Sequence, residues 1–404
     1  MAKGIVIIGG GQAGLSAAIE LRKRKYAGPV TVLAGEAALP YQRPPLSKTY
    51  LSGEMALDRL WLKPEAFYAK AGIDLRTGVR AHAIDRASCE VICEDGSRIG
   101  YDDLILATGG EARPLPIPGA GLEGVHVLRT LAEADALSAA LEEARTLVII
   151  GAGYIGLEVA AASRKRGKEV VVLEAADRPM ARTASALLSG WFGAIHRGYG
   201  VDLRVGAAVN RIEGETRVTG VKVGDEVIEA DLVLIAAGLS PNVDLAQAAG
   251  LEVSDGIEVD AHARTSDPNI YAVGDVARFT LARYGRSVRL ESVHNAIEQA
   301  KAAARAILGE GEAYDPVPWF WSDQYELKLQ IAGLIEGADT LVRRGDPEEG
   351  RFALFHLQDG ALIACEAVNC APEFMAAQRM IAAGARPDPE RLRDQSVAMK
   401  DFLS

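Results

Sequence analysis

The sequence predicts an α/β protein in which two Rossmann-like dinucleotide-binding domains are joined to a smaller α+β C-terminal domain. Two observations lead to this fold class. A strand, a glycine-rich turn and a helix follow one another twice, because residues 148–166 repeat residues 6–24 with all three glycines in place. The last part of the chain instead alternates as strands (351–357 and 362–367) and finishes in a helix. A repeated dinucleotide unit suggests two bound dinucleotides.

Composition narrows the class of protein. The 404 residues are enough for two to three domains, and 49% hydrophobic residues with 42 glycines fit an α/β globular enzyme. The formal net charge of −11 argues against nucleic acid as a partner, because phosphate contacts need clustered lysine and arginine. No apolar run approaches the roughly 18 residues of a membrane span, and the histidines lack the spacing of metal ligands. We therefore expect a cytoplasmic protein without a membrane or metal site.

The first glycine turn ends the apolar strand that starts at Ile5. Gly9, Gly11 and Gly14 have G-x-G-x-x-G spacing, and Leu15 to Lys25 reads as the following helix. In this context the glycines make a tight turn, admit a pyrophosphate close to the backbone and let helix pack on strand. The helix N-terminus then faces the phosphates. The second copy has the same spacing at Gly151, Gly153 and Gly156.

An acidic residue ends the second strand of each copy. Residues 29–34 predict a strand that leads to Glu36, and residues 169–173 predict one that ends at Glu174. A carboxylate about 20 residues after the glycine turn accepts hydrogen bonds from ribose hydroxyls. Because Glu174 would repel a 2′-phosphate, we expect NADH rather than NADPH on the second copy. Arg178 and Arg182 follow closely and could either serve the pyrophosphate or weaken this preference for NADH.

Two further strands lead to small or acidic residues. Residues 101–109, YDDLILATG, predict a buried strand, and its end at Thr108 and Gly109 brings backbone close to a cofactor. Residues 265–277, TSDPNIYAVGDVA, predict a strand that leads to Asp275, whose carboxylate can hold a cofactor hydroxyl.

The loop over residues 40–48, PYQRPPLSK, cannot continue a helix because of its prolines. With the two glycine turns and the AVGD segment, it resembles the pyridine-nucleotide-dependent flavoprotein reductases, and among them the ferredoxin reductases of the putidaredoxin reductase type. The resemblance covers almost the whole chain. It implies FAD on the first glycine turn and NADH on the second. It also implies transfer of electrons to a [2Fe-2S] ferredoxin that serves a monooxygenase (cytochrome P-450 type) or a dioxygenase.

The resemblance also assigns roles to individual residues. It implies that Arg43 lies near the flavin pyrophosphate and Lys48 near the isoalloxazine ring. Glu158 stands where the first copy has Ser16, and we hypothesise that it pairs with Lys48 beside the flavin. Further residues expected at the cofactor are Glu291 and Val293, at the start of a helix over 291–304, and Trp321, in the aromatic segment PWFW.

The same resemblance divides the chain. We expect an FAD-binding domain made of 1–113 and 242–317, an NADH-binding domain over 114–241 and a C-terminal domain over 318–404. Within the first domain, residues 76–79 and 83–92 are expected to form a hairpin insertion.

The electron acceptor is predicted less directly. The first copy is followed by RPPLSK and no cysteine, where disulfide reductases of this fold carry a reactive thiol, and Cys365 and Cys370 lie far from both turns. Electrons are therefore expected to pass to a docked protein, and residues 278–305, with six basic against two acidic side chains, could steer an acidic ferredoxin. Alternatives are a rubredoxin reductase, an NADH oxidase, or a binding flavoprotein that senses NADH and resembles apoptosis-inducing factor.

Overall fold

The computed structural model describes residues 3–403 and contains two compact units. Unit 1 comprises residues 1–42, 57–111 and 240–318, and unit 2 comprises residues 43–56, 112–239 and 319–404. The chain thus passes between the units several times. Two of these crossings contain the short strands β8 (Gly110–Ala112) and β17 (Leu239–Pro241).

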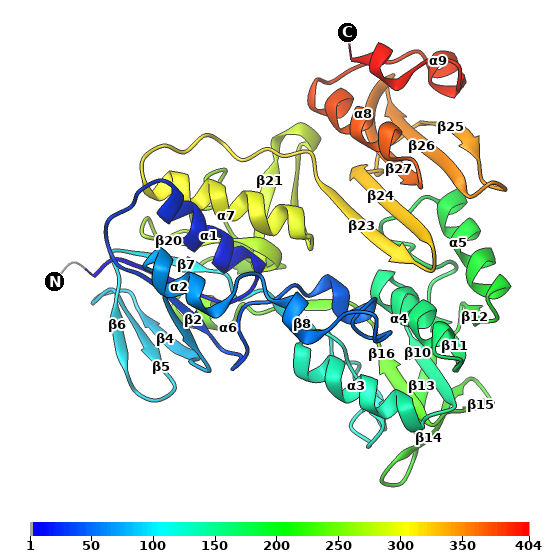
Figure 1. The fold of residues 1–404 in the computed structure, drawn as a ribbon, viewed down its shortest axis with the longest axis horizontal. Helices are drawn as coiled ribbons and strands as arrows, with labels where there is room; N and C mark the ends of the chain where they lie inside the picture. Colours follow the sequence, from blue (N-terminus) through cyan, green and yellow to red (C-terminus); the bar gives the residue numbers. More distant parts are fainter. Residues whose placement is uncertain (1–2, 404) are drawn as a thin grey trace. The chain divides into compact units, whose positions relative to one another are not determined.

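Unit 1 is built on a five-stranded parallel sheet with the order β20-β7-β1-β2-β3. Its strands are β1 (Ile5–Ile8), β2 (Val30–Ala34), β3 (Asp74–Thr77), β7 (Asp103–Leu106) and β20 (Ile270–Ala272). The apolar run of β1 is fully buried because helices cover a parallel sheet on its faces. Helices α1 (Gln12–Lys23) and α7 (Val293–Ile307) lie side by side on this sheet (Figure 1), where alanines such as Ala17, Ala300 and Ala303 permit close packing.

The predicted hairpin insertion is partly wrong. Residues 74–77 form β3, which pairs in parallel with β2 at the edge of the main sheet, and residues 86–89 form a turn inside the expected second strand. The insertion is a three-stranded antiparallel sheet of β4 (Ala81–Asp85), β5 (Glu90–Cys93) and β6 (Arg98–Gly100). Unit 1 is completed by α2 (Glu65–Ala71), α6 (Asp244–Ala248) and a sheet of β18 (Val253–Ser254), β19 (Gly256–Glu258), β21 (Ala277–Leu281) and β22 (Arg286–Arg289).

Unit 2 repeats the parallel sheet of unit 1. Its order is β12-β11-β10-β16-β9, so that β10, β11, β12 and β16 correspond to β1, β2, β3 and β7. These strands are β9 (Val125–His126), β10 (Thr146–Ile150), β11 (Glu169–Glu174), β12 (Asp202–Val205) and β16 (Leu232–Ile235). In unit 2 the fifth strand, β9, precedes the glycine turn in the sequence, whereas in unit 1 the fifth strand, β20, follows it.

Helices α3 (Leu131–Glu143), α4 (Tyr154–Lys165) and α5 (Ala186–Gly198) accompany this sheet, with a smaller sheet of β13 (Val209–Gly214), β14 (Val218–Val223) and β15 (Glu226–Glu229). A second, antiparallel sheet has the order β23-β24-β27-β26-β25. It consists of β23 (Trp319–Gln324), β24 (Leu327–Gly333), β25 (Thr340–Asp346), β26 (Arg351–Gln358) and β27 (Ala361–Val368), with α8 (Ala371–Ala382) and α9 (Pro389–Arg393). Figure 1 shows α8 lying against this C-terminal sheet.

Within residues 3–403, no helix has the length and the apolar character needed to span a membrane.

Candidate cofactor sites

The first glycine turn is shaped so that only its middle glycine faces open space. A Cβ on Gly9, whose φ is 123°, would lie 2.1 Å from the carbonyl oxygen of Ala107. A Cβ on Gly14 would lie 1.9 Å from the carbonyl oxygen of Gly9, so the start of α1 rests directly on the turn. At Gly11 a Cβ would meet no described atom within 4 Å. This is the shape that a pyrophosphate requires, because it must approach the backbone where no side chain stands.

The second glycine turn has the same geometry. A Cβ on Gly151 would lie 2.5 Å from the Ala236 carbonyl oxygen, and one on Gly156 would lie 2.1 Å from that of Gly151. A Cβ on Gly153 would again meet no described atom within 4 Å. Both turns therefore fit a dinucleotide, and the repeat seen in the sequence is a repeat in three dimensions.

The carboxylates of Glu174 and Glu36 accept hydrogen bonds from different kinds of groups. The Glu174 carboxylate accepts hydrogen bonds from the backbone N–H groups of Ala152 at 2.7 Å and Ala176 at 2.8 Å, so it braces the second glycine turn itself. The Glu36 carboxylate accepts one from the Tyr41 hydroxyl at 2.6 Å. The bracing role of Glu174 was not predicted, since sequence spacing does not show which backbone groups meet a side chain.

The AVGD segment lies against the start of α1. Gly274 has a φ of 78°, and a Cβ there would lie 2.9 Å from the Cβ of Ala13. Its N–H donates to the Gln299 side chain of α7 at 2.9 Å. Asp275 follows in a short 3-10 turn, so unit 1 brings it to the same end of α1 as the first glycine turn.

The remaining expected residues of unit 1 lie at element ends. Thr108 follows β7, and its hydroxyl donates to the carbonyl oxygen of Asn242 at 2.8 Å. Gly109 has a φ of 64°, which favours glycine. Val293 is the first residue of α7, whose N-cap is Ser292, while Glu291 forms an ion pair with Arg289 at 2.7 Å.

Lys48 and Glu158 form a buried ion pair within unit 2. Lys48 Nζ lies 2.7 Å from Glu158 Oε2, and the Ser47 hydroxyl donates to the same oxygen at 2.6 Å. The prolines of the loop shape this contact, because Pro44 to Ser47 form a 3-10 turn whose first carbonyl also accepts from Lys48 Nζ at 3.2 Å. Glu158 lies in the first half of α4 and is 4% exposed. The pairing that the sequence suggested is therefore present.

Ser322 is a member of this cluster that sequence reasoning missed. Its hydroxyl donates to Glu158 Oε1 at 2.6 Å, so both carboxylate oxygens are occupied. The signal was available, because side chains alternate along a strand and Ser322 interrupts the aromatic run of β23. The same alternation puts Trp321 on the other face of β23, with its ring centroid 5.8 Å from that of Trp319.

Three arginines that the sequence singles out or places near the second turn have different surroundings. Arg43 donates to the carbonyl oxygen of Arg129 at 2.7 Å. Arg178 holds the loop after β11, through the carbonyls of Ala181 and Ala184. The exposed Arg182 lies near Gly238 at the end of β16, with its Nη2 3.6 Å from where a Cβ would stand.

The expected excess of positive charge over residues 278–305 is largely compensated. Its basic side chains pair with carboxylates, several of them outside the stretch: Arg278 with Asp255 and Glu258, Arg283 with Asp315, Arg289 with Asp255 and Glu291, Lys301 with Glu298 and Arg305 with Glu20. A count along the sequence missed these partners. The stretch is therefore a weaker candidate for steering an acidic protein than its composition suggests.

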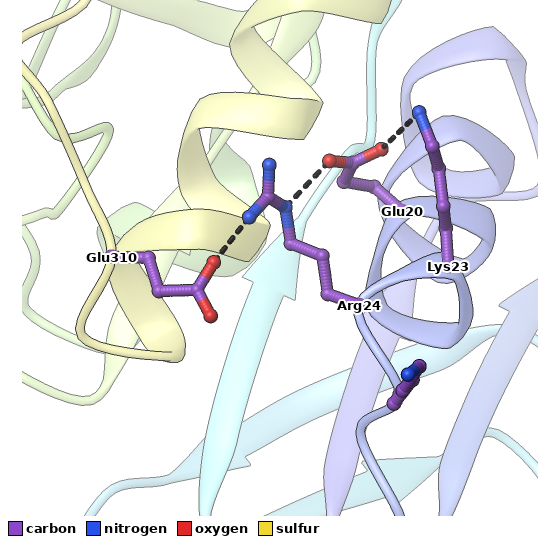
Figure 2. Close-up of a pocket in the computed structure, with 5 residues that line it drawn as sticks. Glu20, Lys23, Arg24 and Glu310 are labelled. Atoms are coloured by element: carbon purple, nitrogen blue, oxygen red, sulfur yellow. Dashed lines mark hydrogen bonds and ion pairs between the residues drawn. The ribbon is translucent and has the colours of Figure 1, made fainter.

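A hollow at the C-terminal end of α1 is not a cofactor site. It is lined by Glu20, Lys23, Arg24, Lys25 and Glu310. Figure 2 shows Arg24 between the carboxylates of Glu20 and Glu310, with Lys23 on the other side of Glu20. The two carboxylates are both paired, and the Arg24–Glu310 pair fastens α1 to the segment after α7. The glycine turn lies at the opposite end of the same helix.

Family models match almost the whole chain. One, described as pyridine nucleotide-disulphide oxidoreductase, matches residues 3–300, and one described as reductase C-terminal matches residues 319–403. The chain belongs to the pyridine nucleotide-disulphide oxidoreductase family. Membership confirms the predicted α/β fold, the prediction of an oxidoreductase, and FAD and a pyridine nucleotide as its cofactors. When bound, the nicotinamide would supply a hydride, and the flavin would convert it into single electrons.

Relatives of this oxidoreductase extend over its full length. Rhodocoxin reductase of Rhodococcus erythropolis is 45% identical over 98% of this chain and 93% of its own. Putidaredoxin reductase CamA of Pseudomonas putida is 40% identical over 99% of this chain and 96% of its own. Among solved structures, the ferredoxin reductase for the CYP199A2 system from Rhodopseudomonas palustris is similar with a TM-score of 0.97 at 40% identity, covering 100% of both chains.

Proposed function

We propose that the protein is an FAD-containing NADH:ferredoxin oxidoreductase, which passes electrons from NADH through FAD to a [2Fe-2S] ferredoxin serving a monooxygenase (cytochrome P-450 type) or dioxygenase system. The observation that carries this proposal is the duplicated glycine turn, open only at Gly11 and Gly153. Two such turns on one chain supply sites for an electron donor and for the flavin that accepts from it.

The choice of a protein acceptor has two supports. The relatives include reductases named for rhodocoxin and putidaredoxin, and one similar structure is a covalent complex of putidaredoxin reductase with putidaredoxin. In addition, burial raises the pKa of the Cys370 thiol to about 11 and raises that of Cys365 as well. Thiols held protonated are poor nucleophiles, so this pair is unsuited to carry electrons as a dithiol.

The test is a direct assay of the purified yellow protein with NADH and cytochrome c. We expect fast cytochrome c reduction only when a [2Fe-2S] ferredoxin is added. Fast oxygen consumption without ferredoxin would instead identify an NADH oxidase, and reduction of rubredoxin in preference to ferredoxin would identify a rubredoxin reductase. Slow flavin bleaching with a long-lived charge-transfer band would favour a binding protein that senses NADH.

The proposal extends to the individual sites. FAD binding is assigned to Gly9, Gly11, Gly14, Glu36, Arg43, Lys48, Thr108, Gly109, Asp275, Glu291, Val293 and Trp321, and NADH binding to Gly151, Gly153, Gly156, Glu174 and Arg182. Lys48 and Glu158 are assigned to the hydride-accepting end of the flavin. We propose the corresponding domains as 1–113 with 242–317, 114–241 and 318–404, and a cytoplasmic location, where NADH is available as a diffusible substrate.

Replacing Lys48 with methionine is expected to slow flavin reduction by NADH about 10- to 100-fold, because a positive charge next to a developing negative charge is lost. Stopped-flow absorbance of the flavin measures this rate. Lys165→Met is the matched control, since Lys165 pairs with Glu54 in an exposed ion pair of unit 2 and is expected to leave the rate unchanged. An unchanged rate in Lys48→Met would remove Lys48 from the mechanism.

Replacing Glu174 with glutamine is expected to shift the preference from NADH toward NADPH. The amide keeps an acceptor for one of the two backbone N–H groups but no longer repels a 2′-phosphate. The ratio of kcat/KM for NADPH to that for NADH should rise about 5- to 20-fold. Glu169→Gln, at the exposed start of the same strand, is the control. A ratio that moves equally in both variants would contradict the assignment of Glu174 to the ribose.

A further inference from the structure

A continuous chain of buried hydrogen bonds leads away from Glu158 within unit 2. Ser322 Oγ contacts Glu158 Oε1 at 2.6 Å, and Gln324 Nε2 contacts Ser322 Oγ at 3.1 Å. Gln324 Oε1 lies 2.8 Å from His196 Nε2, and His196 Nδ1 lies 3.2 Å from the Tyr325 hydroxyl. Three of these side chains, those of Ser322, Gln324 and His196, are fully buried. At the outer end, the ring of Tyr325 stacks on Tyr199, which is 48% exposed.

The direction of every hydrogen bond in this network follows from the Glu158 carboxylate at its inner end. A carboxylate only accepts, so the Ser322 hydroxyl donates its one hydrogen to Glu158 and accepts from the amide nitrogen of Gln324. The amide oxygen of Gln324 then accepts from Nε2–H of His196. Burial lowers the pKa of His196, which keeps the imidazole neutral, so Nδ1 accepts from the hydroxyl of Tyr325. All four donors therefore point toward the Glu158 carboxylate.

Such an arrangement orients groups rather than conducting protons. A chain of serine, histidine and tyrosine can pass a proton by successive exchange, but the Gln324 amide in its middle cannot release one at neutral pH. Aligned hydrogen bonds polarise one another and favour a single arrangement of the whole network. With Ser322 fixed on Oε1, the other oxygen of Glu158 is left for Lys48 and Ser47.

The backbone conformation of Tyr325, at the outer end of these hydrogen bonds, supports a role for its side chain. Tyr325 has a φ of 56° in the two-residue turn between β23 and β24, a conformation that favours glycine or asparagine. A tyrosine there is strained, because its Cβ disfavours the left-handed region. Glycine would relieve the strain but would remove both the hydroxyl on His196 and the ring on Tyr199.

We propose that Ser322, Gln324, His196 and Tyr325 are positioning residues, which hold the Glu158 carboxylate in one orientation toward Lys48 and connect it to the turn between β23 and β24. The catalytic consequence rests on the proposed function, in which the Lys48–Glu158 pair supports flavin reduction by NADH. The hydrogen-bond pattern itself does not depend on that function.

The test uses ¹⁵N-histidine NMR of the holoenzyme together with stopped-flow flavin reduction. The signals of His196 are identified by their loss in His196→Asn. In the unsubstituted protein we expect a neutral imidazole with its proton on Nε2. In Ser322→Ala the amide of Gln324 loses the acceptor that orients it, so His196 should become a mixture of both tautomers. The rate of flavin reduction should fall about fivefold, with the Kd for NADH unchanged.

Ser163→Ala is the matched control. Ser163 is fully buried on the same helix as Glu158, and its hydroxyl has no hydrogen-bond partner among the described residues. Neither the His196 tautomer nor the rate should change in this variant. Ser322→Thr retains the hydroxyl and should restore both readouts.

Two results would overturn the proposal. One is a His196 tautomer that is protonated on Nδ1 or does not respond to Ser322→Ala. The other is a tautomer that responds while the rate of flavin reduction stays the same. If instead the proposed function is wrong, the unsubstituted enzyme will be reduced by NADH but will not reduce ferredoxin. That result distinguishes failure of the proposed function from failure of the positioning role.

Discussion

Replacing Gly14 with alanine is expected to yield a protein that does not retain FAD and unfolds at a lower temperature. A Cβ at this position would stand 1.9 Å from the carbonyl oxygen of Gly9. The backbone of neither glycine can move away without displacing α1 from the end of β1. The strain therefore falls on the contact that shapes the turn. The flavin absorbance per protein after gel filtration and the midpoint of thermal unfolding measure the two effects.

Gly11→Ala separates the binding role of the turn from its structural role. Here the added methyl group meets no described atom within 4 Å, so the fold should be kept while the methyl occupies the space of the pyrophosphate. We expect FAD affinity to fall about 10- to 100-fold with little change in the unfolding midpoint. Gly121→Ala, outside both turns and with similar free space around it, should change neither property. Stoichiometric FAD in Gly14→Ala would show that the close contact has no role.

Sequence alone predicted the parts of this molecule that are local and repeated. Each glycine turn needs only a buried strand, three glycines and a helix within about 15 residues, and both were found where expected. The strand end at Glu174 was also correct, and β2 ends two residues before Glu36, because the spacing from turn to second strand is set by one helix and one loop. Local spacing cannot identify partners, which is why the N–H groups bound by Glu174 were not foreseen.

Errors arose where partners come from distant segments. Residues 74–77 and the insertion after them both look like short strands, and only pairing with β2 distinguishes an edge strand of the main sheet. The basic stretch over 278–305 was counted without Asp255, Glu258, Asp315 and Glu20, which neutralise it in space. The Lys48–Glu158 pair was predicted only because a family resemblance supplied the distant partner.

Replacing His356 with leucine is expected to destabilise unit 2 by about 3 kcal/mol, because it removes the hydrogen-bond partner of one oxygen of the buried Glu366 carboxylate. His356 Nε2 lies 2.9 Å from Glu366 Oε2, and both side chains are buried within the C-terminal sheet. The midpoint of thermal unfolding, followed by circular dichroism, should fall by about 10 °C. His82→Leu changes an exposed histidine in the same way and is expected to have little effect.

The double variant His356→Leu with Glu366→Leu decides how the loss arises. If an unpaired buried charge causes it, removing that charge should recover most of the midpoint, whereas loss of packing alone would make the double variant less stable than the single one. Recovery should stay incomplete, because Glu366 Oε1 also accepts from the N–H of Ser185, the N-cap of α5, at 2.7 Å. The opposite end of α5 carries His196, so this helix is joined to the C-terminal sheet by polar contacts at both ends. A helix fixed in this way holds His196 in register with Gln324, which the orientation of Glu158 requires.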